Sequence, residues 1–141
     1  MRTENYTEQK QRLPKSGRHI IGCREDENII VYQAFNPQIA DYAVDKHHFG
    51  GPAYSFNRMS WIKPGFLWMM YRAGWATKDQ QERILMITLP LVHFKTILAQ
   101  ATFSSYNEEV YKTHDNWKAA LDKTEVRLQW DPDHDPFGNK E

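Results

Sequence analysis

The side chains best suited to chemistry lie in the segment 54–75, which has three basic residues, Arg58, Lys63 and Arg72, and no Asp or Glu. Lys63 comes directly before Pro64 and Gly65, where the sequence predicts that a helix begins. Free N–H groups at a helix N-terminus attract anions, a nearby cation strengthens that attraction, and glycine permits close approach. The spacing therefore predicts a phosphate site at Lys63 and Gly65, with Arg58 and Ser60 sharing one face of the extended segment before it.

Flat aromatic side chains surround these charges, namely Trp61, Trp68, Tyr71 and Trp75. They offer surfaces on which a base or a nicotinamide ring could stack. The same segment also fits a packing helix over 64–73, because 66–70 is apolar on every side and should lie at the centre of the core. Lys63 would then extend to solvent and Arg72 would cap the helix C-terminus. Aromatic stripes usually pack, so the residues alone favour the core helix over the ligand site.

Two further groups of carboxylates could carry chemistry. Glu82, at the mouth of an expected strand, could polarise a hydroxyl or stabilise an oxocarbenium ion, or could be a solvated strand end. Asp131, Asp133, His134 and Asp135 resemble the ligands of a divalent cation. Prolines within that group and the turn preference of Asp favour a surface turn instead, so we expect no metal site. Nucleotide and hydrolase signatures such as GxGxxG, GxxxxGK[ST], HExxH and GxSxG are missing.

Hydrophobic patterning predicts the elements that hold these residues. A β-branched strand over 28–35 is followed by a helix that Asn36 caps and Pro37 begins. A second apolar strand over 83–89 leads into an amphipathic helix, and 125–130 alternates as a half-exposed strand. The pattern predicts an α+β fold with a small, mostly antiparallel sheet. We expect residues 1–26 to form a disordered arm and 27–141 to form one domain that lacks a final strand or helix.

Composition limits the classes of protein that remain. The chain has 141 residues, with 18 Lys and Arg against 18 Asp and Glu, so its formal net charge is zero. A uniformly basic nucleic-acid coat and an acidic tail protein are therefore excluded. The single cysteine, Cys23, allows no internal disulfide and favours a reducing compartment. The polar N-terminus and short apolar runs predict no secretion signal and no membrane partner, and so a cytoplasmic protein.

Several motifs are similar to those of one protein family. Val31–Phe35, Gln81-Glu82-Arg83, Arg127–Pro132 and above all the block RMSWIKPGFLWMMYRAGW over 58–75 resemble DUF4291, a family of unknown function. The resemblance covers about 27–137. The resemblance implies a further strand and a terminal helix, so this chain looks C-terminally short, and it implies serine at the position of Gly65.

The resemblance also implies a small ADP-ribosyltransferase-like domain, in which an early strand and a split antiparallel sheet hold NAD. The first-strand Arg or His of that fold corresponds to Gln33 or Tyr32 here. The leading hypothesis is accordingly an enzyme that handles NAD or another nucleotide, with Glu82 and Lys63 as catalytic residues. The expected cofactor-binding residues are Tyr32, Gln33, Arg58, Ser60, Trp61, Lys63, Gly65, Arg72 and Trp75.

Two other hypotheses use the same sequence features. In one, the basic and aromatic residues form a non-catalytic RNA- or nucleotide-binding module, which would bind single strands in a salt-dependent way. In the other, the chain is a truncated, inactive paralogue that self-associates through an unpaired sheet edge. Both stay open at this stage.

Overall fold

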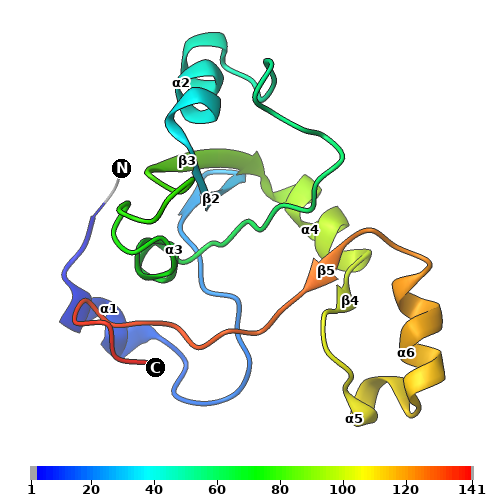
Figure 1. Ribbon diagram of the computed structural model, residues 1–141. Helices are drawn as coiled ribbons and strands as arrows, with labels where there is room; N and C mark the ends of the chain where they lie inside the picture. The colour runs from blue at the N-terminus through cyan, green and yellow to red at the C-terminus, as the bar shows by residue number, and fades with distance from the viewer. Residues whose placement is uncertain (1–2, 141) are drawn as a thin grey trace. The chain divides into compact units, whose positions relative to one another are not determined.

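The computed structural model describes residues 3–140 and contains both helices and strands, which confirms the α+β class. The helices are α1 (Tyr6–Arg12), α2 (Pro37–Lys46), α3 (Phe66–Arg72), α4 (Leu91–Ala99), α5 (Glu108–Tyr111) and α6 (His114–Leu121). The strands are β1 (Arg24–Glu25), β2 (Asn28–Phe35), β3 (Arg83–Pro90), β4 (Thr102–Phe103) and β5 (Arg127–Leu128). The helices and strands predicted around 28–46 and 83–99 are all present (Figure 1).

The strands form two sheets. The larger is antiparallel, with the order β1-β2-β3, and Arg24 pairs with Ile29 where its edge strand begins. The smaller joins β4 and β5 in parallel, with Thr102 opposite Arg127. The chain divides into two compact units, which are described separately. The pocket unit comprises 3–23, 30–87 and 132–140, and the second unit comprises 24–29 and 88–131.

Strand β2 is the centre of the pocket unit, because both of its faces are covered. Ile30 and Tyr32 form one buried cluster with Met69 of α3. Phe35 lies on the opposite face, because side chains alternate along a strand, and forms a second buried cluster with Ile39 and Ala40 of α2. Figure 1 shows α2 and α3 on opposite sides of the β2–β3 pair. A strand covered on both faces must be a nearly continuous apolar run, which explains the sequence of β2.

Helix α2 begins and ends as local chemistry dictates. The Asn36 side chain accepts a hydrogen bond from the Ile39 N–H at 2.9 Å, and Pro37 occupies the first turn, as predicted. At the other end His47 itself takes the left-handed conformation, with φ of 58°, so the helix ends at Lys46, four residues before Gly50. Gly50 and Gly51 lie in the loop that follows.

Helix α3 is shorter and more exposed than predicted. It spans seven residues after the N-cap Gly65, rather than beginning at Pro64. Among its residues only Met69 is buried, and Tyr71 is half exposed. The expectation that this helix lies at the centre of the core was therefore wrong. The core is centred on β2, and α3 contributes one apolar face to it, while the loop before α3 is irregular apart from the bridge between Lys63 and Tyr32.

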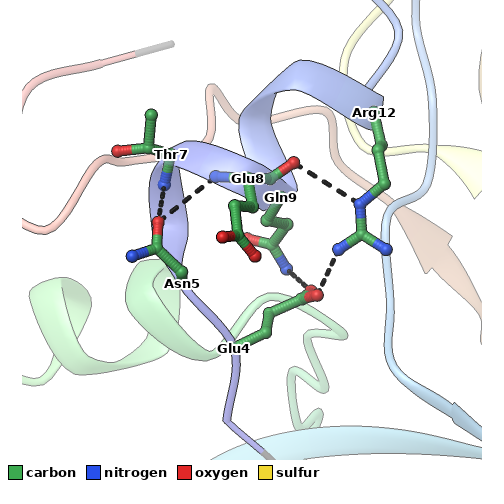
Figure 2. A network of polar contacts seen from close by, with 6 residues as sticks. All are labelled: Glu4, Asn5, Thr7, Glu8, Gln9 and Arg12. Carbon is green, nitrogen blue, oxygen red and sulfur yellow. Dashed lines mark hydrogen bonds and ion pairs between the residues drawn. The ribbon is translucent and has the colours of Figure 1, made fainter.

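Regular structure begins earlier in the chain than the apolar pattern indicated. Helix α1 lies within the segment 1–26 that we expected to be a disordered arm. Its buried contacts are few, and local polar contacts stabilise it (Figure 2). Asn5 Oδ1 accepts from the N–H groups of Thr7 and Glu8 at 2.9 and 3.3 Å, while the Arg12 guanidinium forms an ion pair with Glu4. Polar capping of this kind leaves no hydrophobic periodicity in the sequence.

The second unit contains α4 to α6 and the β4–β5 pair. The Thr113 hydroxyl caps α6 through the Asn116 N–H, and the Asn107 side chain caps α5 through the Val110 N–H. The Trp117 indole N–H donates to the Phe103 carbonyl at 2.9 Å, which connects α6 to β4. The half-exposed strand predicted over 125–130 is regular only at Arg127–Leu128. None of the helices within residues 3–140 has the length and apolar character needed to cross a membrane.

Candidate functional site

A pocket of about 200 Å³ opens in the pocket unit, where β2 ends and both α2 and α3 contribute residues. Six of its lining residues carry amides or guanidinium groups, and they are Gln33, Asn36, Arg58, Arg72, Gln80 and Gln81. The other six are apolar or aromatic, and they are Ala34, Phe35, Ile39, Trp61, Trp68 and Met69. The lining contains no carboxylate, so its charge is entirely positive.

The two arginines of this pocket are available to a ligand. Arg58 lies on the irregular loop before α3, and Arg72 is the last residue of α3. Both are exposed, and neither makes a hydrogen bond or an ion pair with any residue in 3–140. Guanidinium groups bind phosphate and carboxylate oxygens in a bidentate way. Two of them on one acid-free pocket therefore favour an anionic ligand.

The amide side of the pocket is held by hydrogen bonds. The buried Gln33 donates from Nε2 to the Ser60 hydroxyl, which connects β2 to the loop before α3. Asn36 Nδ2 donates to Gln80 Oε1 at 2.8 Å, which connects the start of α2 to the loop after α3. These contacts place amides around the pocket at positions far apart in the sequence, where they can donate to and accept from the polar edge of a ring.

Gln80 needs support because its backbone lies in the left-handed region, with φ of 62°. Its N–H donates to Glu82 Oε1 at 3.0 Å. Glu82 does not line the pocket, although its neighbour Gln81 does. Its second oxygen, Oε2, is buried and has no hydrogen-bond partner among residues 3–140. Glu82 was predicted to be catalytic, and the contact that the structure shows for it positions Gln80 in the pocket wall.

Lys63 and Tyr32, both predicted to contact ligand, are used inside the fold. Their backbones form a bridge, in which the Lys63 N–H donates to the Tyr32 carbonyl at 3.0 Å and the Tyr32 N–H donates back at 2.6 Å. The Lys63 ammonium lies 4.3 Å from the centre of the Trp68 ring. The Tyr32 ring packs edge-on against Phe66, with 5.2 Å between centroids. Neither side chain lines the pocket.

Gly65 likewise lies outside the pocket lining. It is the N-cap of a helix of only seven residues, and its extended backbone has φ of −83°. A Cβ built at this position would lie 3.6 Å from Asp133 Oδ1. That carboxylate lies where the sequence analysis expected a phosphate, and like charges repel. Arg58 and Arg72 thus line the pocket, whereas Lys63 and Gly65 lie outside its lining.

The remaining predicted residues divide between the pocket and its surroundings. Trp61 lines the pocket, as do Gln33, Arg58 and Arg72, so the structure brings together four of the predicted ligand residues. Ser60 supports Gln33 from behind. Trp75 lies three residues beyond Arg72, with a left-handed backbone (φ of 54°) and a half-exposed ring.

Asn36 and Gln80 contribute to the pocket but were not predicted as site residues. Asn36 was predicted as a helix cap, and its second role, as part of the pocket lining, was therefore missed. The contact between its amide and Gln80 joins residues 44 positions apart, and no local pattern indicates such a contact. Gln81 was named only within the motif Gln81-Glu82-Arg83, and no role in ligand binding was predicted for it.

The acidic group near the C-terminus forms a turn. Asp135 accepts hydrogen bonds from the Asn139 side chain and from the N–H groups of Asn139 and Phe137, all at 2.8 Å. These donors, the Asn139 side chain first, hold the pKa of Asp135 below its ordinary value of 3.8. Within residues 3–140 no group of three or more His, Cys, Asp or Glu side chains is arranged to hold a metal ion.

Comparison with known proteins places the chain in a family. The sequence profile described as "Domain of unknown function (DUF4291)" matches residues 19–141. The chain belongs to this family, as the block over 58–75 predicted. No curated protein and no solved structure matches the chain, so no similarity to an ADP-ribosyltransferase supports that part of the resemblance.

Proposed function

We propose that the chain binds a nucleotide in the pocket at the end of β2. In this proposal Arg58 and Arg72 bind phosphate oxygens, and the indole of Trp61 or Trp68 lies against the base. The observation that carries the proposal is the pair of exposed guanidinium groups, without partners among residues 3–140, on a pocket that has no lining carboxylate. Anion-binding groups beside flat indoles match the two chemical parts of a nucleotide.

The amide groups favour a nucleotide over a simple phosphate. Asn36, Gln33, Gln80 and Gln81 present both donors and acceptors, as the polar edge of a base or a ribose requires. Inorganic phosphate would contact the arginines but would be too small to contact these amides and the indoles as well. We therefore expect a nucleotide to bind more tightly than phosphate alone.

A narrower form of the proposal is transfer of ADP-ribose from NAD. In that reaction the bond between nicotinamide and C1′ of the ribose breaks, and nicotinamide leaves with the electron pair. An acceptor nucleophile then bonds to C1′ and loses a proton. Glu82 holds the backbone of Gln80 in the pocket wall, and its buried Oε2 has no hydrogen-bond partner among residues 3–140. Release of nicotinamide by the purified chain tests this form directly.

The test of nucleotide binding is calorimetric titration of the full chain with AMP, ATP, GTP, NAD and inorganic phosphate. We expect at least one nucleotide to bind, and Arg72→Ala to weaken its binding roughly 10- to 100-fold, because a hydrogen bond to a charged group is lost. Lys78→Ala is the matched control. It removes one exposed positive charge from the same unit at a residue that does not line the pocket.

Two results would overturn the proposal. One is a cooperatively folded chain that binds none of these ligands at millimolar concentration. The other is equal weakening by Arg72→Ala and Lys78→Ala, which would indicate general electrostatic attraction rather than a site. Thermal unfolding of each variant establishes that it is folded before it is titrated.

A further inference from the structure

The surface beside the pocket carries exposed aromatic rings that no core requires. Phe56 is 77% exposed and makes an edge contact with Tyr54, with 4.9 Å between ring centroids. Trp75 is 54% exposed. Phe56 lies two residues before Arg58, and Trp75 three residues after Arg72, so the chain holds the Cα atom of each within about 11 Å of the Cα atom of a pocket arginine. Both rings therefore belong to segments that supply the pocket, and both are accessible from solvent.

The segment that carries both rings has formal charges of one sign, as the pocket lining does. The segment 54–75, which contains both rings and both arginines, has no Asp or Glu. Aromatic rings on a positively charged surface are the features by which proteins bind single-stranded nucleic acids, because bases stack on the rings and cations bind the backbone. Charge complementarity thus favours a polyanion carrying flat groups.

The size of the pocket is consistent with one nucleotide unit. Its volume is about 200 Å³, whereas pockets that enclose a drug-sized ligand have roughly 300–1,000 Å³. Any ligand longer than one unit must therefore continue onto the surrounding surface. Phe56 and Trp75 lie on that surface, on the two segments that supply Arg58 and Arg72.

From these observations we infer that the nucleotide in the pocket is the end of a single-stranded nucleic acid, whose next bases stack on Phe56 and Trp75. This inference rests on the proposed nucleotide site and names its ligand class. The strand end enters the pocket, Arg58 and Arg72 bind its phosphates, and the exposed rings bind the following bases. A strand should accordingly bind more tightly than a single nucleotide.

The experiment compares binding of AMP with binding of short oligo(A) strands to the full chain. Strands of RNA and of DNA, with a fluorophore at either the 5′ or the 3′ end, are titrated and followed by fluorescence anisotropy. We expect at least tenfold tighter binding of a strand than of AMP. A label on the end that enters the pocket should weaken binding, and added salt should weaken strand binding more than AMP binding.

Paired phenylalanine variants make the test specific. Phe56→Ala should weaken strand binding roughly 5- to 100-fold, because one stacked base loses its ring, and should leave AMP binding unchanged. Phe137→Ala is the control, since Phe137 is 89% exposed but lies beside Asp133 and Asp135. A strand phosphate is repelled there, so this variant should bind like the wild type.

The outcomes separate this inference from the proposed function. If AMP binds and strands bind no more tightly, the inference fails and the nucleotide site stands. If Phe56→Ala and Phe137→Ala change strand binding equally, the inference also fails. If neither AMP nor any strand binds, the proposed function fails together with the inference.

Discussion

At the scale of a single residue, two roles for the Glu82 carboxylate make different predictions: positioning of Gln80 and catalysis. Its Oε1 accepts the N–H of Gln80, whose left-handed backbone needs that support. Glu82→Gln keeps an acceptor in place, whereas Glu82→Ala removes it. For a positioning role we expect Glu82→Gln to bind nucleotide like the wild type and Glu82→Ala to bind several-fold more weakly, because one hydrogen bond at the pocket wall is lost. Calorimetric titration of both variants provides the measurement.

Catalysis by Glu82 predicts a different pattern in the same two variants. If the carboxylate stabilises a positive charge that develops on the ribose, Glu82→Gln should lose nicotinamide release while it still binds NAD. Equal nucleotide binding by Glu82→Gln and Glu82→Ala would contradict the positioning role.

At the scale of the element, helix α3 begins without a side-chain cap. Gly65 has N-cap geometry, and a Cβ there would meet neighbouring atoms only at 3.6 and 3.7 Å, which are ordinary contact distances. Gly65→Ser adds a hydroxyl that can accept from the first turn, so the free energy of unfolding should rise by a few tenths of a kcal/mol. Gly65→Ala adds the Cβ alone and should lower it, to about 1 kcal/mol below the serine variant.

Denaturant unfolding of the three proteins measures this difference. Equal stability of the serine and alanine variants would show that the hydroxyl forms no cap.

The C-terminal turn should respond to acid in a defined direction. The pKa of Asp135 in the folded chain lies below its ordinary value of 3.8, because Asn139 and Phe137 donate to the carboxylate. A lowered pKa means that this contribution to stability is complete above pH 3.8 and is lost as the pH falls through the lower, folded value. The amide signals of Phe137 and Asn139 should therefore shift below pH 3.8 in an NMR titration.

Asp135→Asn provides the control for this titration. Its amide oxygen can still accept hydrogen bonds but does not titrate, so the low-pH shift of the two signals should disappear. A shift that persists in this variant would contradict the assignment of the titration to Asp135.

At the scale of the whole molecule, the sequence predicts local patterns well and contacts between distant segments poorly. Strand β2 with the capped helix α2, and β3 followed by α4, were predicted because apolar periodicity and helix caps lie within a few residues. The helix predicted over 64–73 is present over 66–72, but the prediction that it lies at the centre of the core was wrong. An all-apolar sequence does not reveal that neighbouring segments leave Tyr71 and Trp75 exposed.

The pocket shows the same division. Arg58, Trp61 and Arg72 were predicted because their types stand out in an acid-free segment, and Gln33 came from the resemblance. The exclusion of Lys63 and Tyr32 from the pocket follows from a bridge between segments about thirty residues apart, which only the folded chain reveals. The contact between Asn36 and Gln80 joins residues that are even further apart in the sequence, so no local pattern predicted it.

The two hydrogen bonds of Asn36 have a consequence for how ligand preference could be redesigned. Its oxygen begins α2 and its nitrogen holds Gln80, so one side chain serves both the helix and the pocket wall. Replacing Asn36 by a residue that cannot cap a helix, such as Ala, removes both contacts at once. Gln81 lines the same pocket and its side chain makes no hydrogen bond within residues 3–140. Libraries that vary Gln81 and keep Asn36 therefore change the pocket lining and leave the cap of α2 in place.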